Sequence, residues 1–155
     1  MAFMEWDERM SVGLAELDGD HKILIEVINQ LDANVGERAK SIVVRQALVV
    51  LARYAQFHFA REERVMAACG YAELPQHRVE HREFVQRIRG IAERLEKEPD
   101  ARAIIVNDEL LGFLKDWLRH HILIVDMAYR PVVENSVRAR HAARSFRSTD
   151  IWWSS

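Results

Sequence analysis

The sequence predicts an all-α protein, namely an up-down-up-down antiparallel four-helix bundle with an N-terminal arm and a C-terminal extension. Three observations support this fold class. Residues that break helices are sparse, with six Gly and three Pro among 155 residues, and strand-like alternation of apolar and polar residues is nearly absent. Four long segments instead carry apolar residues at helical spacing. Short connections between them favour antiparallel neighbours.

The first two helical segments are bounded by capping residues and glycines. We expect the first segment to follow `LDGD`, where Asp18 or Asp20 could cap it, and to end near Gly36. The second is expected to begin near Ser41 and to stop at Gly70.

The last two segments are bounded mainly by prolines. The third is expected to start at Pro75, because proline is favoured in the first helical turn, and Pro99 closes it. The fourth is expected to follow Asp100 or Asn107 and to end before Pro131.

Two flanks complete the chain. We expect residues 1–131 to form the bundle together with an arm laid over it, and residues 132–155 to form an extension that is first basic and then aromatic. A further short helix packed on the bundle, followed by a frayed end, is the expected structure of the extension. Its arginines and the pair Trp152 and Trp153 could also contact a protein partner.

Composition excludes several classes of protein. The formal net charge of −2 gives no indication of nucleic acid binding, and none is expected. Cys69 is the single cysteine, so an intramolecular disulfide framework and a cysteine-rich metal site are excluded. The N-terminus lacks signal-peptide features, and Arg45 and Arg53 interrupt the most apolar long window, so we expect a cytoplasmic protein without a membrane span.

Polar residues continue the apolar stripes of all four helical segments. A lone histidine in a core is usually a hydrogen-bonded structural residue. Several buried imidazoles together need a common partner, because burying a polar group is costly unless it is hydrogen-bonded or bound to a metal. The residues expected to project inward are His21, His58, Glu62, His77, His81 and His121.

The types of these residues indicate which metal they suit. The pairs His58/Glu62 and His77/His81 are each four residues apart, which places both side chains on one helix face. Imidazoles and carboxylates without thiolates suit iron, whereas four ligands would saturate a single zinc. Five imidazoles with two carboxylates, namely Glu62 and one further acid, would make seven ligands, which are too many for one ion but fit two ions that share both carboxylates. One ion would then keep an open position for a small molecule.

The chain resembles the hemerythrins, and in particular the single-domain bacteriohemerythrins. The resemblance spans roughly residues 6–131 and rests on five histidines and two acids in a specific order. The matching pieces are Trp6, `SVGLAELDGDH`, `HFAREERVMAACGY`, `HRVEH` and `WLRHHILIVDMAY`.

The resemblance implies a non-heme di-iron centre. One iron would be bound by His77, His81 and His121, and the other by His21 and His58. Glu62 and Asp126 would bridge the two irons alongside an oxo or hydroxo group. Proteins of this family bind O2 reversibly at the two-histidine iron. By the same resemblance, the residues expected to line the O2 pocket are Leu24, Trp117, Leu118 and Ile122.

Several neighbouring polar residues are expected to lie outside the site. His120 and His141 are predicted to be surface residues, and Glu63 is predicted to face solvent because the spacing from His58 favours Glu62. Asp20 stands where the family more often has Gln, and we expect it to be exposed or to cap a helix.

The separation of His121 and Asp126 does not fit a regular helix. Five residues rotate by about 500°, which is about 140° off the stripe. We therefore expect either a local widening of the helix near Ile122–Asp126 or a carboxylate that reaches in from the helix end.

Four functions are compatible with these residues. Reversible O2 carriage, storage or delivery is favoured over oxygen or redox sensing, because a sensor usually carries an attached output domain. A ferritin-like oxidase is disfavoured because no Glu has His three residues later. We expect no enzyme activity beyond minor peroxide or nitric oxide chemistry. A metal-free or iron-storing bundle is the least favoured, since buried imidazoles without metal would destabilise it.

Overall fold

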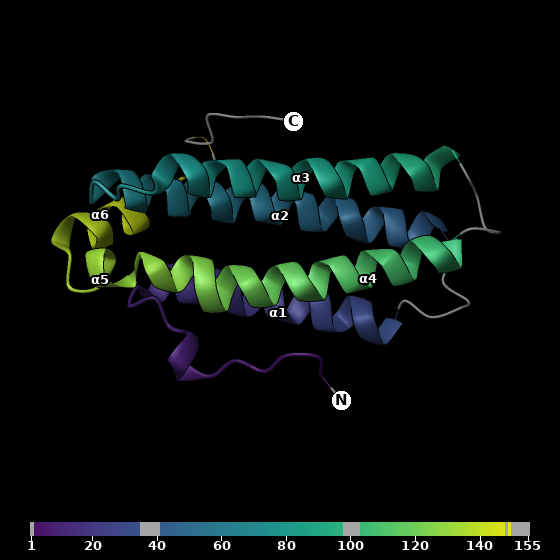
Figure 1. The fold of residues 1–155 in the computed structure, drawn as a ribbon, viewed down its shortest axis with the longest axis horizontal. Coiled ribbons are helices and arrows are strands. Elements are labelled where there is room, and N and C mark those ends of the chain that lie inside the picture. Colours follow the sequence, from purple (N-terminus) through teal and green to yellow (C-terminus); the bar gives the residue numbers. More distant parts are fainter. Residues whose placement is uncertain (1, 35–40, 98–102, 148, 150–155) are drawn as a thin grey trace.

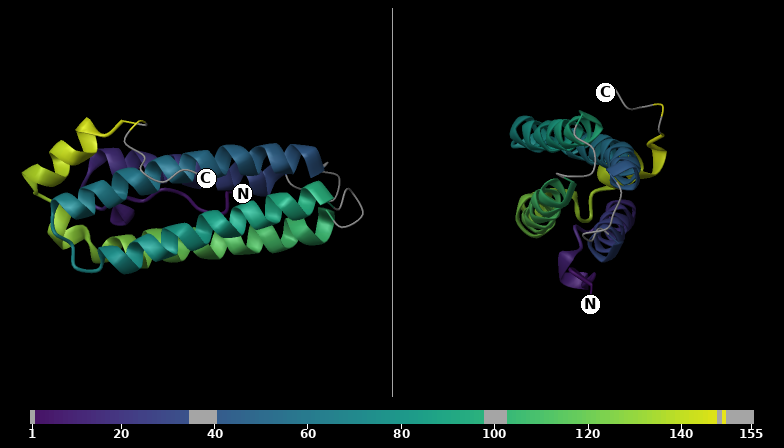
Figure 2. Two further views of the ribbon diagram at one scale, coloured as in Figure 1. Left: turned by 90° about the horizontal axis from the view of Figure 1, so that it is seen from above. Right: turned by 90° about the vertical axis from the view of Figure 1, so that its right-hand side faces the viewer.

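The computed structural model describes residues 2–34, 41–97, 103–147 and 149, and in this part of the chain the fold is the predicted four-helix bundle. Four long helices run side by side along one axis (Figure 1). Each contacts its neighbour in sequence, and the fourth closes the ring against the first (Figure 2). These helices are α1 (Ala15–Asn34), α2 (Ser41–Ala68), α3 (Leu74–Lys97) and α4 (Ala103–His120).

The first helix begins earlier than predicted. It starts at Ala15, so neither Asp18 nor Asp20 is its N-cap. Asp18 lies in the first turn and accepts hydrogen bonds from the backbone N–H of Val12 at 2.9 Å and the hydroxyl of Ser11 at 2.5 Å. A carboxylate is favourable at this end of a helix because the helix dipole is positive there.

The remaining boundaries agree in part with the predictions. Helix α2 begins at Ser41 as expected and ends at Ala68, shortly before Gly70, whose φ of +66° suits glycine. Helix α4 already includes Asn107. It ends at His120, before Pro131 as predicted, and Pro131 lies in the first turn of a separate short helix, α5 (Arg130–Val133). The predicted boundaries at Gly36, Pro99 and Asp100 lie outside the described residues.

Among the residues that the structure describes, the apolar core consists of two clusters at different levels of the bundle. The larger cluster spans all four long helices and includes Leu24, Phe59, Phe84 and Leu118. The smaller one includes Leu17, Met66, Leu74 and Tyr129. On α1, α2 and α3 a short polar stretch separates the two clusters. No helix in the described ranges has an apolar run long enough to cross a membrane.

The C-terminal flank packs at the end of the bundle that holds the smaller cluster, whereas the N-terminal arm also lies along the larger cluster, into which Met4 is buried. The predicted further helix is present as α6 (Val137–Ser145), which Ser136 caps by accepting from the N–H of Ala139, and it packs mainly on α2. The loop before α1 approaches the turn after α5 so closely that a Cβ on Gly13 would lie 2.6 Å from the Cβ of Glu134. Gly13 also has a φ of +86°, so two constraints require glycine there. Trp152 and Trp153 lie outside the described residues.

The packing of the core predicts that substitutions at two adjacent residues of α2 have different effects on the free energy of unfolding. Leu51 is completely buried, whereas Val50 is 61% exposed. We expect Leu51→Ala to lower the free energy of unfolding by about 2–5 kcal/mol, because it removes buried methyl groups and leaves a cavity. Val50→Ala should change it by less than about 0.5 kcal/mol. Urea denaturation of both variants measures the difference, and equal effects would contradict this packing.

Candidate metal centre

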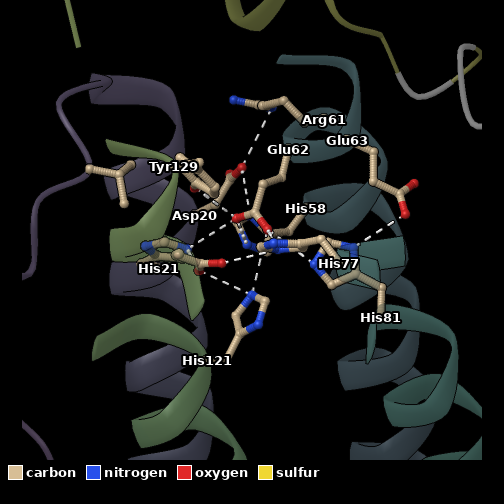
Figure 3. A network of polar contacts seen from close by, with 12 residues as sticks. Asp20, His21, His58, Arg61, Glu62, Glu63, His77, His81, His121 and Tyr129 are labelled. Atoms are coloured by element: carbon tan, nitrogen blue, oxygen red, sulfur yellow. Dashed lines mark hydrogen bonds and ion pairs between the residues drawn. The ribbon is translucent and has the colours of Figure 1, made fainter. Parts of the chain in front are cut away.

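Seven polar side chains meet between the two apolar clusters, and they are the seven predicted metal ligands (Figure 3). None is more than 3% exposed. Their donor atoms form two overlapping groups, and within each group the atoms lie within 4.8 Å of one another. The seven are His21 from α1, His58 and Glu62 from α2, His77 and His81 from α3, and His121 and Asp126 after α4.

The carboxylate of Glu62 lies at the centre of this cluster, and its two oxygens face different sets of imidazoles. Oε1 lies 2.7 Å from Nε2 of His77, 3.0 Å from Nε2 of His81 and 3.6 Å from Nε2 of His121. Oε2 lies 3.2 Å from Nε2 of His58 and 3.5 Å from Nε2 of His21. The imidazoles are therefore divided into a group of three and a group of two, with Glu62 between them.

Asp126 is the second carboxylate between the two groups. Its Oδ2 lies 2.9 Å from Nε2 of His21 and 3.0 Å from Nε2 of His121. Its Oδ1 lies 3.2 Å from Nε2 of His77. Asp126 thus contacts imidazoles of both groups, as Glu62 does.

A π-helical turn brings Asp126 into the site. The segment η2 (His121–Val125) is a π-helix, and the backbone N–H of Asp126 bonds to the carbonyl of His121, five residues earlier. This wide turn leaves Asp126 fully buried, whereas Val125 is only half-buried. A short 3-10 segment, η3 (Asp126–Ala128), follows. The predicted local widening is therefore confirmed, and it explains how a spacing of five residues keeps both side chains on one face.

The donor set fits metal ions better than it fits a hydrogen-bonded core. Buried atoms of this set without a hydrogen bond of normal geometry include both ring nitrogens of His21 and His121 and both oxygens of Asp126. Some of these atoms nevertheless lie close together, for example Nε2 of His21 and Oδ2 of Asp126 at 2.9 Å. Neighbouring ligands of one octahedral ion are separated by a similar distance, roughly 3.0 Å when the metal–ligand bonds are about 2.1 Å. Buried polar atoms normally have partners, so this set of unpaired atoms indicates that cations belong there.

The pKa values of the clustered side chains also indicate that cations belong in this site. Burial alone would lower the pKa of His21 and His77, but the carboxylates of Asp126 and Glu62 outweigh it and raise both pKa values to about 10. Burial would raise the pKa of Glu62, yet His58 and the other imidazoles hold it well below its usual range. Without metal, protonated imidazoles therefore balance the two carboxylates, and metal cations would replace these protons.

Asp20 corrects one prediction. It is buried rather than exposed or capping, and its Oδ2 lies 3.2 Å from Nδ1 of His58. The hydroxyl of Tyr54 donates to its Oδ1 at 3.1 Å. The sequence held a signal for this arrangement, because Tyr54, His58 and Arg61 have helical spacing and present three polar groups on one face of α2.

Glu63 corrects a second prediction. It was expected to face solvent, but it is only 1% exposed, and its Oε1 lies 3.3 Å from Nδ1 of His81. A bundle helix buries a wide face, so the residue after an inward ligand can still lie between helices. Phe59 lies four residues before Glu63 and Met66 lies three residues after it, and both are fully buried. These two apolar residues would have indicated that Glu63 also lies on a buried face of α2.

Tyr129 is a site residue that the sequence analysis did not identify. Its hydroxyl donates to Oε2 of Glu62 at 3.0 Å, and the residue is fully buried. Burial, followed by the charges of Glu62 and Asp126, raises the pKa of Tyr129 well above its usual value. The hydroxyl therefore stays protonated and helps to fix the orientation of the Glu62 carboxylate.

The four residues expected to line an O2 pocket adjoin the cluster on the side of the larger apolar core. Leu24, Leu118 and Ile122 are fully or almost fully buried. Trp117 is half-buried and stacks on His121, with ring centroids 4.3 Å apart and an interplanar angle of 14°. Phe59, which was not singled out from the sequence, stacks on His81 in the same way, at 3.9 Å and 6°.

The two remaining histidines lie outside the cluster, as predicted. His120 and His141 are both exposed. His120 adjoins His121 in sequence but points away from the bundle interior.

Comparison with known proteins identifies the class of protein that this fold and site define. Residues 12–133 match the family model described as the hemerythrin HHE cation binding domain, so the chain belongs to the hemerythrin family. It is 33% identical over 138 residues to a bacteriohemerythrin of Pseudomonas aeruginosa, covering 88% of this chain and 86% of that protein. It is 34% identical to a bacteriohemerythrin of Methylococcus capsulatus, with coverages of 84% and 97%.

A solved structure agrees with this assignment. The crystal structure of wild-type hemerythrin matches with a TM-score of 0.72 and 27% identity, covering 84% of this chain and 98% of that chain.

Removing metal should destabilise the fold, because the cluster then keeps buried atoms without partners. We expect bound Fe²⁺ to raise the free energy of unfolding by about 2.7 kcal/mol at a free concentration of 100 times Kd. Thermal denaturation with and without Fe²⁺, under anaerobic conditions, measures this effect. His121→Ala should weaken the response strongly, whereas the matched variant His120→Ala should retain it. A full response in both variants would contradict the position of the site.

Glu63 should support metal binding through His81. A carboxylate that accepts from the far ring N–H of a ligand histidine orients the ring, and its loss typically lowers metal affinity about 10- to 100-fold. We expect Glu63→Gln to weaken Fe²⁺ binding within this range, measured by competition with a chelator. Glu83→Gln, at an exposed position of α3, is the control and should bind Fe²⁺ as the unmodified protein does. Unchanged affinity in Glu63→Gln would rule out this role.

Proposed function

We propose that this protein binds O2 reversibly at a non-heme di-iron centre in the polar layer of its helix bundle, for carriage, storage or delivery. One observation carries the proposal: the two oxygens of Glu62 face two separate groups of imidazoles. A carboxylate in this position can bridge two metal ions. Membership of the hemerythrin family and similarity to bacteriohemerythrins support the same function.

The contacts favour a particular distribution of ligands. His77, His81 and His121 would hold one iron through the three nitrogens near Oε1 of Glu62. His21 and His58 would hold the other iron near Oε2. Glu62 and Asp126 would bridge the two ions. The two-histidine ion then has fewer protein ligands, which leaves a position for O2.

The irons, when bound, would supply the electrons that make O2 binding strong and reversible. The chain's own residues limit side reactions. Leu24, Leu118 and Ile122 present buried apolar groups beside the cluster, and such a lining excludes water. The hydroxyl of Tyr129 stays protonated and donates a hydrogen bond to Oε2 of Glu62, so its proton is held in this contact. These features favour binding and release over turnover, and we propose that any peroxide or nitric oxide chemistry is minor.

The proposal is tested by reducing the iron-loaded protein anaerobically and then admitting O2. We expect two irons per chain and a visible charge-transfer band that appears with O2 and disappears on deoxygenation. His58→Ala should lose the reversible band, because it removes a ligand of the two-histidine iron. His120→Ala changes an exposed histidine and should keep the band.

Two results would overturn the proposal. Rapid irreversible oxidation of the unmodified protein would favour an enzyme or a sensor over a carrier. A reversible band of full intensity in His58→Ala would refute the ligand assignment.

A further inference from the structure

We propose that Asp20 is a positioning residue for His58, and that the C-terminal helix α6 helps to set this contact through Arg61. The inference rests on the proposed function, because it takes His58 to be a ligand of the two-histidine iron. It goes further by assigning a role at the metal centre to a segment outside the four long helices.

The His58 ring lies between two carboxylates. Its Nε2 lies 3.2 Å from Oε2 of Glu62, on the side of the metal cluster. Its Nδ1 lies 3.2 Å from Oδ2 of Asp20, on the opposite side. A carboxylate at Nδ1 favours the tautomer that has its proton there and its lone pair on Nε2. Asp20 therefore holds the ring in the orientation and the tautomer that metal binding needs.

Only one of the two imidazoles in this group has such support in the part of the chain that the structure describes. Nδ1 of His21 is buried and has no hydrogen-bond partner there. His58 is thus the imidazole whose donor strength the protein can adjust through a neighbouring charge. A carboxylate partner makes an imidazole a stronger donor, which stabilises the oxidised metal more than the reduced metal.

Asp20 is itself held from two further directions. Tyr54 donates to its Oδ1 at 3.1 Å. Nε of Arg61 lies 3.5 Å from its Oδ2, as Figure 3 shows. A buried carboxylate is stable only when it is paired and hydrogen-bonded, and these groups satisfy that requirement. The position of Arg61 therefore affects how strongly the carboxylate of Asp20 interacts with the imidazole of His58.

The end of helix α6 contacts Arg61 together with Phe57 of α2. The guanidinium lies over the ring of Phe57, 4.7 Å from its centroid, and 6.0 Å from the centroid of Phe146. The two rings are in edge contact at 5.2 Å. Phe146 is the C-cap of α6 and is buried against the bundle. A continuous series of contacts thus runs from α6 through Phe146, Arg61 and Asp20 to His58.

The test uses the full-length, iron-loaded protein and three variants. Asp20→Asn keeps the size of the side chain but removes its charge. Phe146→Ala removes a contact of Arg61 without changing an atom of the metal site. Ala143→Gly is the control, because it lowers the helix propensity of α6 while leaving the side chains of Phe146 and Arg61 unchanged. The two measurements are the rate of iron release to a chelator and the reduction potential of the iron centre, with circular dichroism to verify folding.

We expect Asp20→Asn to release iron about tenfold faster or more, and to shift the reduction potential to a more positive value. Phe146→Ala should shift both quantities in the same direction by a smaller factor, and Ala143→Gly should change neither. A purely structural role would change stability without moving the potential. If Asp20→Asn does not fold, Phe146→Ala compared with Ala143→Gly still decides the question.

The negative outcomes are distinguishable. If Asp20→Asn retains the release rate and potential of the unmodified protein while His58→Ala loses iron, the role of Asp20 is wrong and the proposed function stands. If Phe146→Ala behaves as Ala143→Gly does, the contribution of α6 is wrong. If the unmodified protein binds no iron, the proposed function itself fails.

Discussion

The structure depends on one constraint, namely that a charged, polar layer lies inside an apolar bundle. Five imidazoles and two carboxylates are buried between two apolar clusters. Such a layer is stable only if opposite charges face each other closely, and Glu62 meets this condition by presenting one oxygen to each group of imidazoles. The positions of the four helices, the wide turn after α4 and the buried Tyr129 all serve this arrangement.

The fold and six of the seven clustered residues were predictable from the sequence because both depend on periodicity. Inward positions repeat along a helix, so His58 and Glu62, or His77 and His81, can be assigned to one face from spacing alone. Asp126 could not be assigned in this way, since a π-turn changes the number of residues per turn locally. Its assignment came from resemblance, and the backbone bond from Asp126 to His121 supplies the physical reason.

The residues around the cluster were harder to predict. Glu63 was expected to face solvent, and Asp20 was expected to be exposed or to cap a helix, but each contacts the outer nitrogen of a cluster histidine. The apolar periodicity of a single helix predicts only which residues face the core. Contacts between neighbouring helices also depend on how each helix is rotated about its own axis. The start of α1 was misjudged for a related reason, because Asp18 interacts with the preceding loop rather than capping the helix.

The π-turn after α4 has a consequence for protein design. Threading the same seven residues onto four ideal, regular helices would direct the position of Asp126 about 140° away from the His121 face. Such a scaffold would reproduce the fold and the imidazoles, yet it would lack one of the two carboxylates that contact both groups of imidazoles. The π-turn at His121–Val125 is therefore needed to position the second carboxylate, and a designed backbone would have to include it.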